Sequence, residues 1–123
     1  MTDQRFLPCY RLRRGADFRR VYARKRSASD GRLVLYACEN NLAFPRLGLS
    51  VSVRVGPAVV RNRWKRLLRE AFRLRRTELP AGVDIIAIPR GARAPELISL
   101  GESLVRLANQ AGGKLTKKSR GSQ

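Results

Sequence analysis

Two stretches of the chain show the period-two pattern of a β-strand. Residues 32–38 place apolar side chains on both faces, and residues 46–54 alternate more cleanly between apolar side chains and polar or small ones. The apolar run at residues 83–88 predicts a third, buried strand, and residues 26–30 give a weaker signal for a fourth. Turn residues separate these stretches, so we expect a sheet built from short strands.

Three other stretches carry apolar residues at the i, i+3 and i+4 spacing of an amphipathic helix. One follows Gly15, one spans residues 55–73 and one begins at Pro95. The middle stretch has the clearest separation into an apolar and a cationic side. At about 100° per residue, its apolar residues fall on one side of the predicted helix and its cations on the other. The apolar side holds Val60, Trp64, Leu67, Leu68, Ala71 and Leu74, and the opposite side holds Asn62, Lys65, Arg66, Arg69, Arg73 and Arg76. This helix can pack through one side while its other side presents positive charge to a polyanion.

The whole chain shares the positive charge of this helix. Its formal net charge is +18 over 123 residues, from 27 Lys and Arg against 9 Asp and Glu. Such a charge causes self-repulsion in the folded state, which a bound polyanion such as nucleic acid would offset. Hydrophobic residues still make up 43% of the chain, enough for one folded domain, which we place at residues 1–111. We expect residues 112–123 to form a basic, disordered tail.

Composition also sets several classes of protein aside. The chain contains no His, the commonest general base and metal ligand. Cys9 and Cys38 are too few for a zinc site, and we expect two buried thiols in preference to one disulfide. Asp30, Glu39 and Asp84 are scattered, so no catalytic carboxylate pair is expected. No apolar run approaches the ~20 residues that span a bilayer, and no signal-peptide core is recognised, so we expect a cytoplasmic protein.

The basic helix carries a long and unusual motif. The run Arg61-Asn62-Arg63, followed by Lys65-Arg66-Leu67 and Arg69-Glu70-Ala71-Phe72, closely resembles the signature of the bacterial ribonuclease P protein subunit. The resemblance continues, in order and spacing, through Asp17-Phe18, Val21-Tyr22, Val34-Leu35-Tyr36 and Gly48-Leu49-Ser50-Val51-Ser52. It covers residues 10–90, whereas the final helix and the tail match only in type.

This resemblance implies both a fold and a function. The fold is an α/β class (α+β) sandwich of order αβββαβα, with helices on a four-stranded sheet and a left-handed crossover through the basic helix. A left-handed crossover departs from the general rule. The function is that of the non-catalytic protein subunit of ribonuclease P, whose catalytic RNA removes the 5′ leader from precursor tRNA. The resemblance thus implies ribonuclease P RNA and precursor tRNA as partners, with Mg²⁺ held mainly by the RNA. We expect no membrane contact, no obligate protein partner, and no catalytic or metal-binding residue in the protein.

The resemblance also implies two sets of site residues. A leader groove between the first helix and the sheet would include the aromatic side chains of Phe18, Tyr22 and Tyr36. Beside them, Gly48, Ser50 and Ser52 leave a shallow floor on the second strand, although a solvated sheet face explains this pattern equally well. The predicted groove comprises Phe18, Tyr22, Tyr36, Ser50, Ser52 and Arg54. The predicted contacts to the catalytic RNA and the leader path are Arg61, Asn62, Arg63, Lys65, Arg66, Arg69 and Arg73.

Two other functions remain open at this point. A ribosomal or other structural RNA-binding protein could carry the same basic helix. A nuclease that acts without RNA is disfavoured, because neither His nor clustered carboxylates supply a base or metal ligands.

Overall fold

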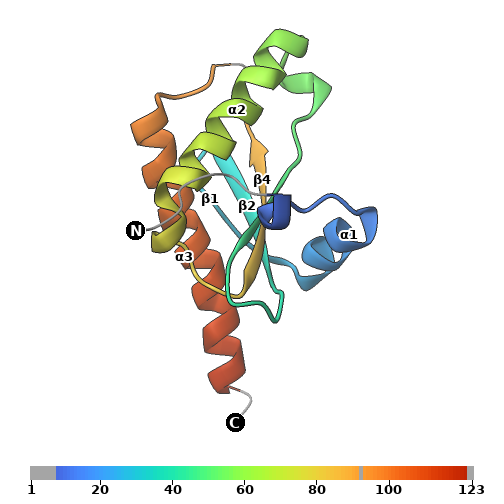
Figure 1. Ribbon diagram of the computed structural model, residues 1–123, viewed down its shortest axis with the longest axis vertical. Coiled ribbons are helices and arrows are strands. Elements are labelled where there is room, and N and C mark those ends of the chain that lie inside the picture. The colour runs from blue at the N-terminus through green and yellow to red at the C-terminus, as the bar shows by residue number, and fades with distance from the viewer. Residues whose placement is uncertain (1–7, 92, 122–123) are drawn as a thin grey trace.

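The computed structural model describes residues 8–91 and 93–121, with the backbone alone described from residue 114 onward. A four-stranded sheet lies between helices on its two faces (Figure 1). In chain order the main elements are α1 (Gly15–Arg24), β1 (Arg26–Ser29), β2 (Leu33–Glu39), β3 (Arg46–Leu49), α2 (Ala58–Arg75), β4 (Val83–Pro89) and α3 (Leu97–Gly121). Short 3₁₀ turns lie at Pro8–Tyr10, Val53–Val55 and Arg76–Glu78. The predicted α+β class and the order αβββαβα are confirmed.

The strands are arranged in the order β1-β2-β4-β3. β2 pairs antiparallel with β1 and with β4, whereas β3 and β4 run parallel. Parallel neighbours need a crossover, and α2 forms it between the end of β3 and the start of β4. The left-handed sense of this crossover stays a prediction. A bridge between Arg11 and Leu47 places the N-terminal segment along the outer edge of β3.

The two faces of the sheet are covered by different helices. On one face, β2, β3 and β4 contribute Leu33, Leu35, Leu47, Ile85 and Ala87 to the main core. α2 packs on them with Trp64, Leu68 and Phe72, and α3 packs with Leu100, Leu104 and Leu107. On the other face, α1 packs around a smaller buried cluster of Leu12, Val21, Cys38 and Ile86. The outer side of α2 and the sheet face beside α1 are therefore the two surfaces on which most of the predicted site residues lie.

The strand predicted over residues 46–54 is shorter in the structure and ends at Leu49. Its partner β4 ends at Pro89, which has no N–H to donate, so the parallel ladder stops soon after the hydrogen bond from Ser50 to Ala87. The hydroxyl of Ser52 then accepts a hydrogen bond from the backbone N–H of Arg54 at 3.1 Å and starts a 3₁₀ turn. The period-two pattern is therefore longer than the paired strand.

The basic helix differs from its prediction at both ends. It begins at Ala58 rather than at residue 55, because Gly56 has a φ of 154° and Pro57 is extended. Near the other end, Leu74 is 39% exposed, and Phe72 is fully buried in its place. Phe72 continues the i, i+4 line of buried side chains, whereas Leu74 is turned about 160° away from Phe72. The prediction that Leu74 belongs to the apolar stripe was wrong.

The predictions for the two cysteines and for the C-terminal end of the domain differ from the structure in part. Cys9 and Cys38 are both unpaired, as predicted, but Cys9 is exposed and only Cys38 is buried. α3 runs on to Gly121, past residue 111 where we placed the end of the domain. Since no side chain beyond Gly113 is described, the division into a domain and a basic tail stays a prediction.

Candidate nucleic-acid interface

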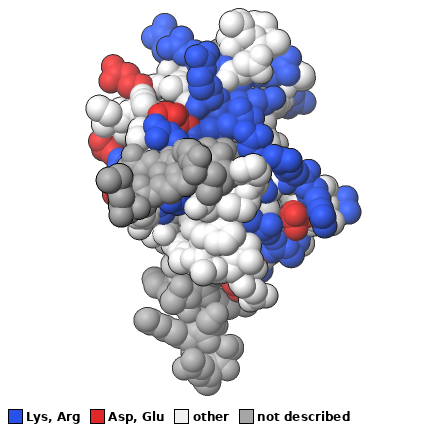
Figure 2. Space-filling model, viewed as in Figure 1, with Lys and Arg blue, Asp and Glu red and all other residues white. Residues whose placement is uncertain are grey.

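The cations of α2 lie on the side turned away from the sheet. Figure 2 shows Lys and Arg side chains gathered over α2 and, at the right of the view, over α1. Of the predicted RNA contacts, Asn62, Arg63 and Arg66 are exposed, and Arg61, Lys65, Arg69 and Arg73 are half-buried. The helical pattern therefore predicts the direction of these side chains correctly, because that direction follows from the helix geometry alone.

Two of these arginines also bind groups within the protein. Arg61 donates a hydrogen bond from Nε to the carbonyl oxygen of Gly56 at 3.1 Å, across the first turn of α2. Arg73 forms an ion pair with Glu70, which lowers the pKa of the Glu70 carboxyl. Part of the charge of Arg73 is thereby offset, so Arg63 and Arg66 are better placed to attract phosphate.

A basic pocket of about 360 Å³ lies between the N-terminal segment, β3 and α2. It is lined by Arg11, Leu12, Arg13, Leu47, Leu49, Lys65 and Arg69. The segment is held there by the bridge to Leu47, whose carbonyl oxygen accepts from the N–H of Leu12 at 3.0 Å. Burial, followed by the charge of Arg11, lowers the pKa of Arg69. Four cations and no acid line this pocket, an arrangement suited to phosphate.

Arg11 and Arg13 were not among the predicted site residues. They are distant in sequence from α2, and only the bridge to β3 brings them beside Lys65 and Arg69. The available signal was the density of cations over residues 11–26, which by itself does not say what those cations face.

An aromatic cluster of Phe18, Tyr22 and Tyr36 lies on the sheet face beside α1. The rings of Tyr22 and Tyr36 meet edge to face, with centroids 5.1 Å apart and planes at 76°. Phe18 packs against β3, where a Cβ atom on Gly48 would come 2.9 Å from its Cζ. All three residues are half-buried. The structure thus brings together the three aromatic residues predicted for the leader groove.

The other predicted groove residues lie at the end of β3 and beyond it. Ser50 is half-buried and follows the strand directly, whereas Ser52 and Arg54 are exposed in the turn before α2. The hydroxyl of Ser52 is used locally, as the acceptor for the Arg54 N–H. Of the floor predicted from Gly48, Ser50 and Ser52, only Gly48 therefore lies within the strand.

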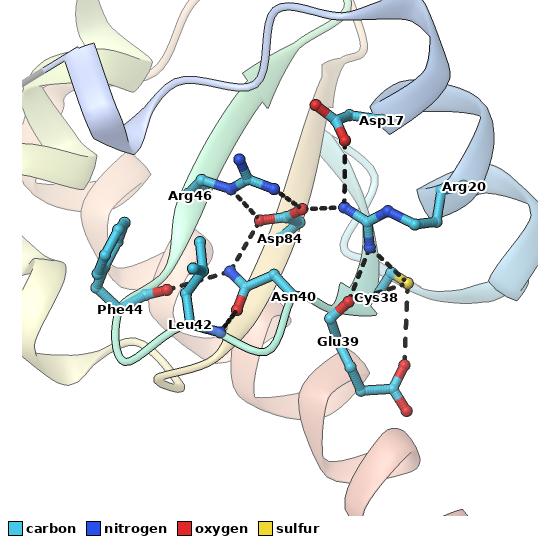
Figure 3. Close-up of polar contacts among 9 residues, drawn as sticks. All are labelled: Asp17, Arg20, Cys38, Glu39, Asn40, Leu42, Phe44, Arg46 and Asp84. Atoms are coloured by element: carbon cyan, nitrogen blue, oxygen red, sulfur yellow. Dashed lines mark hydrogen bonds and ion pairs between the residues drawn. The ribbon is translucent and has the colours of Figure 1, made fainter.

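A network of polar side chains joins α1 to the sheet (Figure 3). Its centre is Asp84 of β4, whose carboxylate is fully buried. Arg46 donates to it from Nε at 2.8 Å and from Nη2 at 2.7 Å, Asn40 donates at 2.9 Å, and Arg20 of α1 also donates. Burial acts to raise the pKa of Asp84, but the hydrogen bonds from Arg46, Asn40 and Arg20 outweigh it and the pKa is lowered. Sequence reasoning missed this network, because its members come from four separate segments.

A second ion pair ties the same helix to the end of β2. Arg24 donates to both carboxylate oxygens of Glu39, at 2.9 and 3.0 Å. These hydrogen bonds lower the pKa of Glu39 to about 2. Two of the cations in the basic segment 11–26 are therefore structural: Arg20 and Arg24 hold α1 against the sheet.

Residues 8–91 and 93–121 contain neither a metal-binding cluster nor a membrane span. Nowhere in this part of the chain do three or more Cys, Asp or Glu side chains gather in a way that could hold a metal ion. No helix in the same part is both long and apolar enough to cross a membrane.

Comparisons with known proteins agree on one family. Residues 6–112 match the family model described as Ribonuclease P. The ribonuclease P protein component of Clostridium kluyveri is 42% identical over 106 residues, which cover 84% of this chain and 95% of that protein. The corresponding protein of Thermoanaerobacter sp. strain X514 is 44% identical over 81 residues, or 66% of this chain and 70% of that one.

Solved structures give the same result. The RNase P protein of Staphylococcus aureus superposes with a TM-score of 0.70 at 36% identity, covering 80% of this chain and 91% of that one. The RNase P protein of Thermotoga maritima, solved in complex with 1-(4-fluorophenyl)-2-thiourea, gives a TM-score of 0.74 at 31% identity. That match covers 80% of this chain and 97% of the Thermotoga protein.

Proposed function

The chain belongs to the ribonuclease P protein family, and from this premise we propose that it binds the catalytic RNA of ribonuclease P and the 5′ leader of precursor tRNA. In this role it is the protein component of the holoenzyme and aids removal of the leader to give the mature tRNA 5′ end. The alternative of a ribosomal or other structural RNA-binding protein is set aside, because the relatives reported above are all ribonuclease P proteins.

The observation that carries the proposal is the basic pocket beside the outer side of α2. Arg11, Arg13, Lys65 and Arg69 come together there from two segments, without an acidic side chain in the lining. The exposed Arg66 adds a further cation on the outer side of the same helix. Guanidinium groups bind phosphate through paired hydrogen bonds, so a folded RNA backbone fits this surface.

The aromatic cluster supports the second half of the proposal. Bases of a single strand stack on aromatic side chains without regard to sequence, which a subunit acting on many leaders requires. Phe18, Tyr22 and Tyr36 are only half-buried on the face of the sheet opposite α2 and α3. We assign the leader to this cluster and the catalytic RNA mainly to the cations of α2.

We further propose that the RNA carries the chemistry, with Mg²⁺ ions that it mainly holds itself. Purified protein should therefore fail to cleave precursor tRNA with or without magnesium, and it should restore processing when added to ribonuclease P RNA at near-physiological salt. Site-specific cleavage by protein repurified after ribonuclease treatment would refute this assignment. A second measurement tests the partner: the protein should copurify at low salt with one ribozyme-sized RNA rather than with ribosomal RNA. The cytoplasmic location expected from the sequence stays a prediction.

A further inference from the structure

Asp84 is the only charged side chain that is fully buried in the part of the chain described with side chains. It lies on the α1 face of the sheet, in register with Cys38 of β2 and Arg46 of β3. A carboxylate withdrawn from water is costly unless hydrogen bonds satisfy its oxygens, and Arg46, Asn40 and Arg20 all donate to it. Arg46 and Asn40 come from the sheet side, whereas Arg20 comes from α1 (Figure 3).

Polar contacts from Arg20 join α1 to the sheet. Val21 is the only residue of this ten-residue helix that is fully buried. Arg20 precedes it, and its guanidinium reaches the Asp84 carboxylate, the carbonyl oxygen of Glu39 at 2.7 Å and Cys38 Sγ at 3.1 Å. These three contacts to two strands help to set the rotation and lateral position of α1, beside the packing of Phe18, Val21 and Tyr22 and the Arg24–Glu39 pair.

In sequence, Arg20 lies between the two aromatic residues of α1, which share a different side of the helix. Phe18 is two residues before it and packs over Gly48, and Tyr22 is two residues after it and packs against Tyr36. A change in the rotation of α1 would therefore move both rings away from the sheet positions that they now meet.

We propose that Asp84 is a positioning residue for leader binding: through Arg20 it holds α1 where the aromatic cluster meets the sheet. The inference rests on the proposed function, since it supposes that this cluster receives the leader. A helix fixed in advance presents its rings in place, so the leader does not have to order them on binding. Asp84 has no exposed surface with which to contact RNA, so its effect passes through Arg20.

The variant Asp84→Asn gives the sharpest test, because positioning and simple electrostatics predict opposite results. The change removes a negative charge, and electrostatics alone would tighten RNA binding. In the amide, one of the two acceptor oxygens becomes an NH2 donor that cannot accept from a guanidinium group, so the link from Asp84 to Arg20 is weakened and α1 is held less firmly. Asp30→Asn is the matched control: it changes the charge equally, and Asp30 pairs with Arg106 of α3 at 2.8 Å, away from α1.

The measurements are the affinities of each variant holoenzyme, at saturating protein, for matched precursor and mature tRNA. Asp84→Asn should weaken precursor binding by about fivefold to fiftyfold and leave mature tRNA binding unchanged, as expected for a coupled contact. Amide hydrogen exchange over residues 15–24 should become faster in this variant. Asp30→Asn should change neither the precursor-to-mature ratio nor this exchange. A wild-type ratio or unchanged exchange in folded Asp84→Asn would overturn the proposal.

Arg20→Lys keeps the inference testable if Asp84→Asn does not fold. It preserves the net charge and leaves Asp84 bonded to Arg46 and Asn40, but one ammonium group cannot reproduce the three contacts of the guanidinium. The same selective loss of precursor binding is expected, with an unchanged salt dependence. A wild-type affinity ratio in Arg20→Lys would overturn the positioning role while the proposed function stands. If the unaltered holoenzyme itself does not prefer precursor tRNA, the proposed leader role fails, and this inference fails with it.

Discussion

The ring of Phe18 lies so close to Gly48 that a Cβ atom at this glycine would come 2.9 Å from Phe18 Cζ. Leu12, from the N-terminal segment, approaches the same point to 3.1 Å. Because Gly48 has no side chain, Phe18 and Leu12 can both pack directly on β3 at this position. Gly48 is in register with Ile86, which in turn is in register with Tyr36, so this close approach sets one side of the aromatic cluster.

Gly48→Ala should therefore displace Phe18 and lower the free energy of unfolding by about 1–3 kcal/mol, as overpacking does in other cores. Thermal unfolding of the isolated protein measures this loss. Gly113→Ala is the control, because a Cβ there meets nothing within 4 Å and alanine favours a helix by about 1 kcal/mol over glycine. Equal stability of Gly48→Ala and the wild-type protein would show that Phe18 moves aside without cost.

Tyr36→Ala should weaken holoenzyme binding to precursor tRNA about tenfold to a hundredfold, because one stacked base contributes about 1–3 kcal/mol. Binding to mature tRNA, which has no leader, should hardly change. Tyr36 also packs against Tyr22, so Tyr36→Phe serves as the control that keeps the ring and its edge-to-face contact. Equal losses on both tRNAs for Tyr36→Ala would mean that this residue serves packing alone.

Arg66→Ala should make the log–log salt dependence of binding to ribonuclease P RNA shallower by about one unit, the value for one lost phosphate contact. Arg66 is exposed on the outer side of α2, so the thermal transition should be little affected. Arg75→Ala on the same helix removes an equal charge, but Glu78 accepts hydrogen bonds from this arginine and offsets it. We therefore expect a smaller change of slope for Arg75→Ala. Identical slopes for the two variants would contradict the assignment of Arg66 to the RNA.

The Arg24–Glu39 pair should make stability depend on acid pH. Arg24 lowers the pKa of Glu39 from its ordinary value of 4.5 to about 2. The pair therefore contributes its full stabilisation of the fold at pH values above 4.5, the pKa in the unfolded chain. That stability is lost as the pH falls through the folded-state pKa. Glu39 is partly exposed, so the effect is modest.

The variant Glu39→Gln measures this contribution. Its melting temperature should lie below that of the unaltered protein at pH 7, and the difference should shrink as the pH approaches 2. A difference that stays constant over this range would show that the carboxylate charge of Glu39 does not support the fold.

The sequence by itself determined the features of this protein that depend on local geometry. The order of helices and strands follows from residue spacing, and the outward direction of Asn62, Arg63 and Arg66 follows from the pitch of α2. The motif on this helix also identified the family, because its residues lie close together in one stretch of the sequence.

Only the tertiary structure decided which of the arginines are exposed at the surface and which form contacts within the protein. Arg19 and Arg20 are adjacent and identical in kind, yet Arg19 is exposed and Arg20 binds the buried Asp84. Asp84 looks isolated in the sequence, and it becomes the centre of a network because β4 lies between β2 and β3. The basic pocket likewise requires Arg11 to reach the edge of β3. These relationships depend on strand pairing between distant segments, which the local pattern of residues does not encode.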